Sequence, residues 1–230
     1  MAILLLIETA TRVCSAALSR DGELLAVKET DQPNAHSARL AVFMAELFQE
    51  TNLTAKDLDA VAVSRGPGSY TGLRIGVSSA KGVAYAADCP LMAIDTLQIL
   101  AAAAREKYPN ARYLVLSDAR RMEVYAGLYD ENLNILRSVQ ADIVTENYYN
   151  SILDKTNKTI AVGDGVEKCC PFLPTDLVTV DLEIRSSAKH MITLAEEKYR
   201  RHDFEDTAYF EPFYLKDFVA GKPRVKGLFE

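Results

Sequence analysis

Residues 3–29 read ILLLIETATRVCSAALSRDGELLAVKE, and this stretch decides the fold class. An apolar run ends at Glu8, a second run follows a short turn, and RDG leads into a third. Three such runs joined by turn residues predict a meander of antiparallel strands. Residues 113–139, YLVLSDARRMEVYAGLYDENLNILRSV, repeat the same order of pieces. The two stretches align without a gap, which places Glu8 opposite Asp118 and predicts an internal duplication.

The segments that follow each meander also correspond. After the first we expect a helix, a strand, a helix, a strand and a helix over residues 34–51, 58–63, 72–87, 90–95 and 96–107. After the second we expect a weaker helix, a strand and a helix over residues 145–155, 159–163 and 187–201. The pattern predicts an α/β fold of two βββαβα lobes, 1–108 and 109–230, with the C-terminal tail packed back on the first lobe. This order of elements resembles the superfamily of actin, the sugar kinases and the heat-shock ATPases.

Composition limits the function classes. The net charge is −6, which argues against nucleic-acid binding by this chain alone. The N-terminal apolar run breaks at Glu8 with no basic residue ahead of it, so we expect neither a signal peptide nor a membrane span. The four cysteines have no zinc-site spacing and, without a secretory signal, indicate a reducing compartment. We therefore expect a cytoplasmic protein.

The glycine-rich segment SRGPGSYTG, residues 64–72, is the first candidate for a ligand loop. It matches neither the phosphate-binding P-loop nor the dinucleotide fingerprint. Gly66 and Gly68 flank Pro67 in a tight reversal, and Ser69 or Thr71 can cap the next helix. A structural turn is the simpler interpretation. An anion held at the helix start, with Gly66 and Gly68 near it, is the alternative.

The helix after this loop carries small residues at every fourth position, namely Gly72, Gly76, Ala80 and Ala84. Glycine inside a helix costs up to about 1 kcal/mol relative to alanine, so the stripe needs a packing reason. Two explanations stay open here. The stripe packs on the sheet of its own lobe, or it makes a close helix contact with another subunit.

Two acids and three histidines are the remaining candidates for chemistry. Glu8 and Asp118 end the first strand of each half, where the superfamily places acids that hold magnesium and a nucleotide. The turns that follow them, TATR and ARRM, lack the glycine that would bring backbone close to a phosphate. The histidines, at 36, 190 and 202, form no pair with the spacing of a metal site on a helix. We therefore expect no catalysis by this chain alone.

Longer motifs resemble a known family. The segment SRGPGSYTGLRIG is similar to the signature of the TsaB (YeaZ) family, and so are LLIETATRVCSAAL, NAHSARL and LSDARRMEVYAGLY. In LLIETATRVCSAAL, Glu8 stands where the family usually has Asp. The resemblance covers residues 1 to about 130 and returns at EPFYLKDF, residues 211–218.

The resemblance implies a non-catalytic scaffold subunit in the synthesis of threonylcarbamoyladenosine on tRNA. It implies that the chain binds and activates a TsaD-type transferase, that a TsaE-type ATPase joins them, and that tRNA is reached only through the complex. Without the transferase, we expect a homodimer. The resemblance places the partner contacts on the two helices beside the glycine loop, at His36, Leu40, Met44, Gly72, Arg74, Gly76, Ser79, Ala80 and Val83.

Cofactors and rival functions follow from the same residues. We expect no cofactor and no metal for the isolated chain, and ATP or ADP only at a partner interface. One alternative is a small kinase or ATPase that uses Glu8 and Asp118 with magnesium. The other is a glycoprotease-like metallopeptidase.

Overall fold

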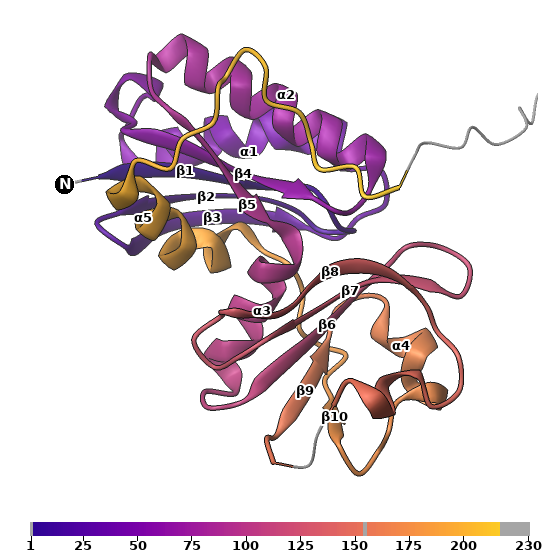
Figure 1. Cartoon of the computed structure of the whole chain (residues 1–230). Helices are drawn as coiled ribbons and strands as arrows, with labels where there is room; N and C mark the ends of the chain where they lie inside the picture. The colour runs from indigo at the N-terminus through magenta and orange to yellow at the C-terminus, as the bar shows by residue number, and fades with distance from the viewer. Residues whose placement is uncertain (1, 154–155, 217–230) are drawn as a thin grey trace, which may run out of the picture.

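The computed structural model describes residues 2–153 and 156–216, which form two five-stranded sheets (Figure 1). The first sheet has the order β3-β2-β1-β4-β5 and consists of β1 (Ile3–Glu8), β2 (Cys14–Arg20), β3 (Glu23–Thr30), β4 (Ala60–Gly66) and β5 (Leu91–Asp95). The second has the order β10-β9-β6-β7-β8 and consists of β6 (Arg112–Asp118), β7 (Glu123–Tyr129), β8 (Ile135–Ile143), β9 (Thr159–Val162) and β10 (Val178–Val180). Each sheet is an antiparallel meander with two further strands parallel to its first strand. The predicted pair of equivalent meanders is confirmed.

The helices differ from the prediction mainly in the second half. The α-helices are α1 (His36–Thr51), α2 (Tyr70–Ala87), α3 (Thr96–Lys107), α4 (Val166–Cys169) and α5 (Ile192–Arg201). Short 3₁₀ turns cover Ala55–Asp57, Tyr148–Ser151, Cys170–Phe172 and Ala188–Met191. The helix predicted over 145–155 is wrong, because only the 3₁₀ turn at 148–151 forms there. Asn147, just before it, has a left-handed φ of 62°, which stops the chain from entering a longer helix.

The long helices of the first lobe bury one face each on the sheet. α1 buries Leu40, Phe43 and Leu47, and α2 buries Val77 and Ala80 in the same apolar cluster. The central strand β1 is apolar on both faces, so its side chains divide between this layer and the opposite one. Both helices therefore lie side by side on one face of the first sheet (Figure 1).

The other face of the first sheet is covered by helices from both halves of the sequence. α3 contacts strands of both sheets, and α5 lies on the first sheet beside β5. One apolar cluster accordingly runs from β1 and β5 through α3 to β6 and β9 and includes Ile192 and Ala195 of α5. The sequence assigned residues 109–230 to the second lobe, whereas α5 packs on the first.

The small-residue stripe of α2 faces inward. A Cβ atom at Gly72 would lie 2.1 Å from the carbonyl oxygen of Thr9, and one at Gly76 would lie 2.1 Å from Thr9 Oγ1. Ala80 and Ala84, further along the stripe, are buried as well. The packing reason that these glycines need is thus the close approach of the turn after β1. Of the two explanations left open, packing within the lobe is the correct one.

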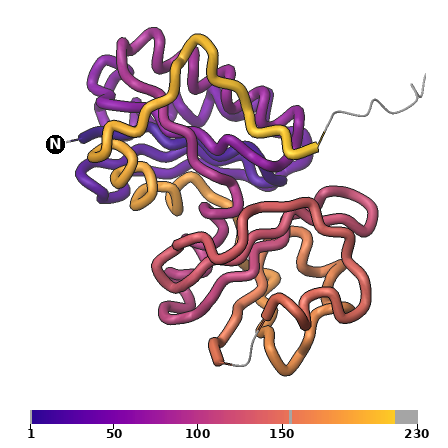
Figure 2. Tube along the Cα trace, in the orientation of Figure 1, coloured from indigo at the N-terminus to yellow at the C-terminus, as the bar shows by residue number. Residues whose placement is uncertain are grey.

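After α5 the chain returns across the first lobe as an extended segment, residues 203–216, here called the C-terminal strap (Figure 2). Glu205 N donates to Leu91 O at 2.8 Å, and Phe213 N donates to Arg65 O at 2.7 Å. Lys81 Nζ of α2 donates to Phe210 O at 3.1 Å. The strap corresponds to the tail predicted to pack back on the first lobe, and residues 217–230 of that tail lie outside the described residues. Among the residues that the structure describes, no helix has both the length and the apolar character needed to cross a bilayer.

A pair of alanine substitutions tests the direction in which α2 packs. Gly72→Ala should lower the free energy of unfolding by about 1–3 kcal/mol, because the new methyl group overlaps the Thr9 carbonyl. Gly82→Ala should raise it by roughly 0.5–1 kcal/mol, because Gly82 has nothing within 4 Å of its Cβ position and alanine is the better helix former. Urea unfolding followed by circular dichroism measures both. Equal effects of the two substitutions would contradict the packing described here.

Candidate functional site

The glycine loop folds against the turn that follows β1. A Cβ atom at Gly68 would lie 2.3 Å from Ala10 O, and Ser69 N donates to that same oxygen at 2.7 Å. Ser69 is the cap of α2, as the sequence allowed, because its hydroxyl accepts from Gly72 N at 3.3 Å. Gly66 has a φ of +112° and lies against the strap, where a Cβ atom would be 2.7 Å from Phe213 O. The glycines thus allow contacts within the chain, and the amides of Ser69 and Gly72 already have protein partners.

Glu8 is a buried carboxyl group at the end of β1. Its Oε1 accepts a hydrogen bond from Ala10 N at 2.6 Å, and the side chain is fully inaccessible to solvent. Burial raises the pKa of Glu8 to about 7, against the opposing effect of the Ala10 amide and of the Ser186 and Ser64 hydroxyls. Because the carboxyl group is enclosed, its surroundings are those of a core residue and not those of a ligand for an ion from solvent.

The predicted alignment of the two meanders is wrong by one residue at the first strand. Leu5 pairs with Leu18 in the first hairpin, and Leu114 pairs with Leu128 in the second. Leu18 and Leu128 correspond as predicted, so Leu5 corresponds to Leu114, whereas the gapless alignment put Val115 there. The second hairpin carries one extra residue in its turn. Local apolar patterns do not detect such an insertion, because both halves of the hairpin keep their alternation.

With the corrected register Glu8 corresponds to Ser117, and Asp118 lies one position beyond. Asp164, at the loop after β9, accepts from Ser117 Oγ at 3.0 Å and from Asp118 N at 2.9 Å. Ser64 of β4 lies beside Glu8 in the first lobe. The acid and the hydroxyl have therefore exchanged strands between the two lobes, and the sequence-based match of Glu8 with Asp118 is replaced by a match of Glu8 with Ser117.

Asp118 has surroundings different from those of Glu8. Its exposed carboxylate accepts from Lys168 Nζ and from Arg120 N, the latter at 2.9 Å. The structure thus gives the two predicted magnesium ligands separate sets of neighbours. Among the described residues, no three His, Cys, Asp or Glu side chains lie grouped as metal ligands do.

A cavity of about 410 Å³ opens beside the turn after β1, and neither Glu8 nor Asp118 lines it. Charged and hydroxyl side chains at its wall are Thr11, Arg12, Asp31, Asp164, Glu167, Arg185 and Ser186. Three carboxylates stand against two guanidinium groups, a balance that does not favour a polyphosphate. The geometry gives no support to the alternative of an ATP-using enzyme built on Glu8 and Asp118. A nucleotide at a partner interface stays a prediction.

The residues predicted to contact a partner divide into three groups. Leu40, Gly72, Gly76 and Ala80 are buried within the lobe. His36, Met44, Ser79 and Val83 are half-buried. Arg74 is exposed and lies over the ring of Tyr70, with its guanidinium carbon 4.6 Å from the ring centroid. The assignment of Leu40, Gly72, Gly76 and Ala80 as partner contacts is therefore corrected: their surfaces are used by the fold.

His36 has a local role in the structure. Its Nε2 donates to the carbonyl oxygen of Thr11 at 3.0 Å, which ties the start of α1 to the turn after β1. The same turn contacts α2 through Thr9 Oγ1, which donates to Gly72 O at 2.8 Å. One turn therefore positions the first residues of both helices.

A second stripe of small residues lies on the outer side of the same helices, and sequence reasoning missed it. We call it the α1–α2 outer face; it consists of Ala38, Ala41, Val42, Ala45, Ser78, Gly82, Tyr85 and Ala86, all exposed. Gly82 has open space around its Cβ position, so the fold itself supplies no reason for a glycine there. The signal was present in the sequence, because Leu73 and Val77 flank the inner stripe and mark that side as the core.

The comparisons with known proteins agree with the motifs. A family model described as TsaD, tRNA N6-adenosine threonylcarbamoyltransferase, matches residues 30–223. The tRNA threonylcarbamoyladenosine biosynthesis protein TsaB of Escherichia coli K12 is 31% identical over 225 residues, which cover 95% of this chain and 96% of that protein. This chain belongs to the TsaB (YeaZ) family. The TsaB protein of Haemophilus influenzae is 28% identical over 232 residues, 95% of each chain.

Solved structures support the TsaB family and the fold class. YeaZ from Pseudomonas aeruginosa superposes with a TM-score of 0.83 at 28% identity, covering 94% of this chain and all of that one. An activator of 2-hydroxyisocaproyl-CoA dehydratase from Clostridium difficile has a TM-score of 0.54 at 10% identity, over 87% of this chain and 97% of that one, and this likeness shows the fold alone. The predicted α/β fold of two similar lobes is confirmed.

Replacement of the buried acid should change how stability depends on pH. The pKa of Glu8 in the folded chain, about 7, lies above its ordinary value of 4.5, so folding favours the protonated form. The contribution of Glu8 to stability should therefore be greatest below pH 4.5 and decrease by roughly 3 kcal/mol at most as the pH rises from 4.5 through 7. Glu8→Gln keeps the acceptor for Ala10 N and should remove this decrease.

The measurement is the free energy of unfolding in urea at pH 4.5, 6 and 8. Glu131→Gln, which replaces an exposed carboxylate, is the control and should follow the wild-type profile. The free energy of unfolding of Glu8→Gln should exceed that of the wild type by an amount that increases with pH. A gain that is the same at all three pH values would show that Glu8 is not a buried acid of raised pKa.

Proposed function

We propose that this TsaB family member is a non-catalytic scaffold subunit that binds and activates a TsaD-type transferase in the synthesis of threonylcarbamoyladenosine on tRNA. The relatives in Escherichia coli and Haemophilus influenzae are named as biosynthesis proteins of that modification. A TsaE-type ATPase as third member, a homodimer in the absence of the transferase and a cytoplasmic location belong to the same proposal.

The α1–α2 outer face carries this proposal. Two parallel-lying helices present alanine, serine and glycine outward, and small side chains let the backbone of another helix approach closely. Val42 keeps 40% of its surface exposed and Tyr85 keeps 86%, which supplies apolar and aromatic area for an interface. A helical layer of similar shape on the partner would complete a four-helix contact.

Gly82 is a better position than Gly76 for a substitution that tests this interface. Arginine at Gly76 would collide with Thr9 and disturb the lobe itself, so a loss of binding would have two explanations. Arginine at Gly82 meets open space and improves helix propensity, so it changes only the outer face.

Gly82→Arg should weaken binding of the TsaD-type subunit at least tenfold, because the long side chain keeps the partner helix away from α2. Sedimentation of the mixed subunits measures binding. Incorporation of labelled threonine into tRNA, started from preformed threonylcarbamoyl-adenylate, measures activation of the transferase. Leu24→Arg, on the exposed side of β3, is the matched control and should bind and activate as wild type does.

Full binding and full activation by Gly82→Arg would place the partner elsewhere and refute the proposed interface. Transferase activity that is independent of this chain would refute the scaffold role itself. The two results are separate, because the first leaves a complex and the second makes the complex unnecessary.

A further inference from the structure

The turn between β6 and β7 has an unusual backbone. Arg120 and Arg121 are consecutive residues with φ of 65° and 53°, both in the left-handed region. Residues other than glycine, asparagine and aspartate rarely adopt this region, because Cβ crowds the backbone. Two arginines in succession are therefore a poor choice for the turn, and the reason for them must lie outside backbone preference.

Lys168 stabilises the backbone of this turn through hydrogen bonds. Its Nζ donates to Arg121 O at 2.8 Å and to Glu123 O at 2.7 Å, and it also binds the carboxylate of Asp118. Arg120 N donates to the same carboxylate at 2.9 Å. These contacts involve only the backbone of the two arginines. The fold thus fixes the turn and leaves both guanidinium groups for another use.

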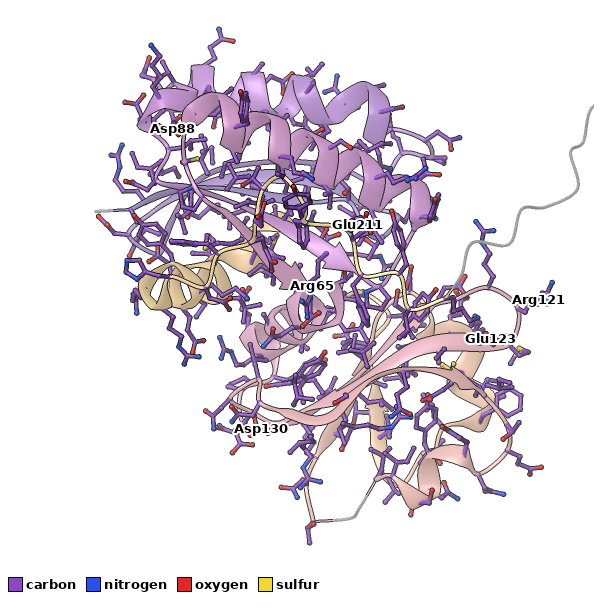
Figure 3. All side chains as sticks on the ribbon, turned by 45° about the horizontal axis from the view of Figure 1, so that its top comes forward. Arg65, Asp88, Arg121, Glu123, Asp130 and Glu211 are labelled. Atoms are coloured by element: carbon purple, nitrogen blue, oxygen red, sulfur yellow. The ribbon has the colours of Figure 1, made fainter. Side chains whose placement is uncertain are left out.

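The two guanidinium groups are directed outward. Arg120 and Arg121 are exposed, and within residues 2–153 and 156–216 neither side chain forms a hydrogen bond or an ion pair. Figure 3 shows Arg121 projecting from the edge of the second lobe. Met122, next in the chain, is 41% exposed, and Ile143, paired with Glu123, is 64% exposed. The turn therefore presents two unpaired cations beside exposed apolar groups.

The C-terminal strap connects this turn to the start of α2. Lys216, at the end of its described part, forms an ion pair with Glu123. Two residues earlier, the ring of Tyr214 lies 5.0 Å from that of Tyr70, the first residue of α2. The turn and the α1–α2 outer face are thus linked by one continuous segment, and a large partner on α2 would extend toward the two arginines.

We propose that Arg120 and Arg121 bind carboxylates of the protein partner that covers the α1–α2 outer face. Guanidinium groups pair with carboxylates through two parallel hydrogen bonds, and a rigid turn reduces the entropy lost on binding. Exposed apolar side chains beside the arginines are typical of a protein interface. A net charge of −6 disfavours RNA as the occupant. This inference rests on the proposed function, since it names a second contact with the same transferase-type subunit.

The decisive variant is Arg120→Asn/Arg121→Gly. Asparagine and glycine are the residues that left-handed positions prefer, so the turn should be retained while both cations are removed. Lys56→Gln/Arg200→Gln removes two exposed charges elsewhere and is the control. Arg120→Lys/Arg121→Lys keeps the charge but not the paired hydrogen bonds. Each is titrated with the purified TsaD-type subunit of the same organism at 50 and 300 mM salt, and with its tRNA.

We expect the Asn/Gly variant to bind the TsaD-type subunit 10- to 100-fold more weakly at 50 mM salt, the lysine variant to be intermediate, and the control to match wild type. The difference should shrink at 300 mM salt, because mobile ions screen the pairs. Unfolding in urea should show the Asn/Gly variant at least as stable as wild type.

Equal affinity of the Asn/Gly variant and wild type would overturn the inference while the proposed function stands. Unchanged protein binding with weakened tRNA binding would overturn it too, and would identify the turn as an RNA contact. Failure of the wild-type chain to bind the TsaD-type subunit would refute the proposed function and this inference together.

Discussion

The contact between the turn after β1 and the first two turns of α2 is the constraint on which the first lobe depends. Thr9 presents its carbonyl oxygen and its hydroxyl to α2, and Thr9 Oγ1 donates to Gly72 O at 2.8 Å. Neither Gly72 nor Gly76 has room for a Cβ atom at this distance. The contact fixes the rotation of α2 about its own axis. It therefore decides which residues of the helix are left for a partner.

Much of the fold follows from local sequence, and the rotation of α2 shows where local sequence is insufficient. Strand alternation and turn residues specify each meander without reference to the rest of the chain. α2, however, carries small residues on two of its sides. Gly72 and Gly76 begin one stripe, and Ser78 and Gly82 lie on the other. Spacing alone is the same for both. Leu73 and Val77 indicate which side is the core, but the contact with Thr9, more than sixty positions away, is what fixes the rotation of the helix.

The candidate site was predicted less well than the fold because one inserted residue changes its chemistry. Ser117 takes the place of Glu8 in the second lobe, and the acid reappears as Asp164 after another strand. An alignment without gaps brings Glu8 and Asp118 together as a pair of ligands. The hydrogen-bond register separates them. Each lobe keeps a pair of one acid and one hydroxyl side chain, with the two residue types exchanged between the strands. The pair supplies hydrogen bonds at the end of the central strand of each lobe, and the two acids are not equivalent.

The exchange of helices between the lobes has a consequence for synthesis on the ribosome. α5 is encoded almost at the end of the described chain, yet Ile192 and Ala195 complete the apolar layer on the first sheet with Leu4 and Leu6. The first half of the chain therefore leaves the ribosome with that layer only partly covered, because α3 is present and α5 is not. It cannot close until the second sheet has been translated. A nascent chain of this kind exposes its oldest segment longest, and is a natural client for chaperones that shield apolar surface during translation.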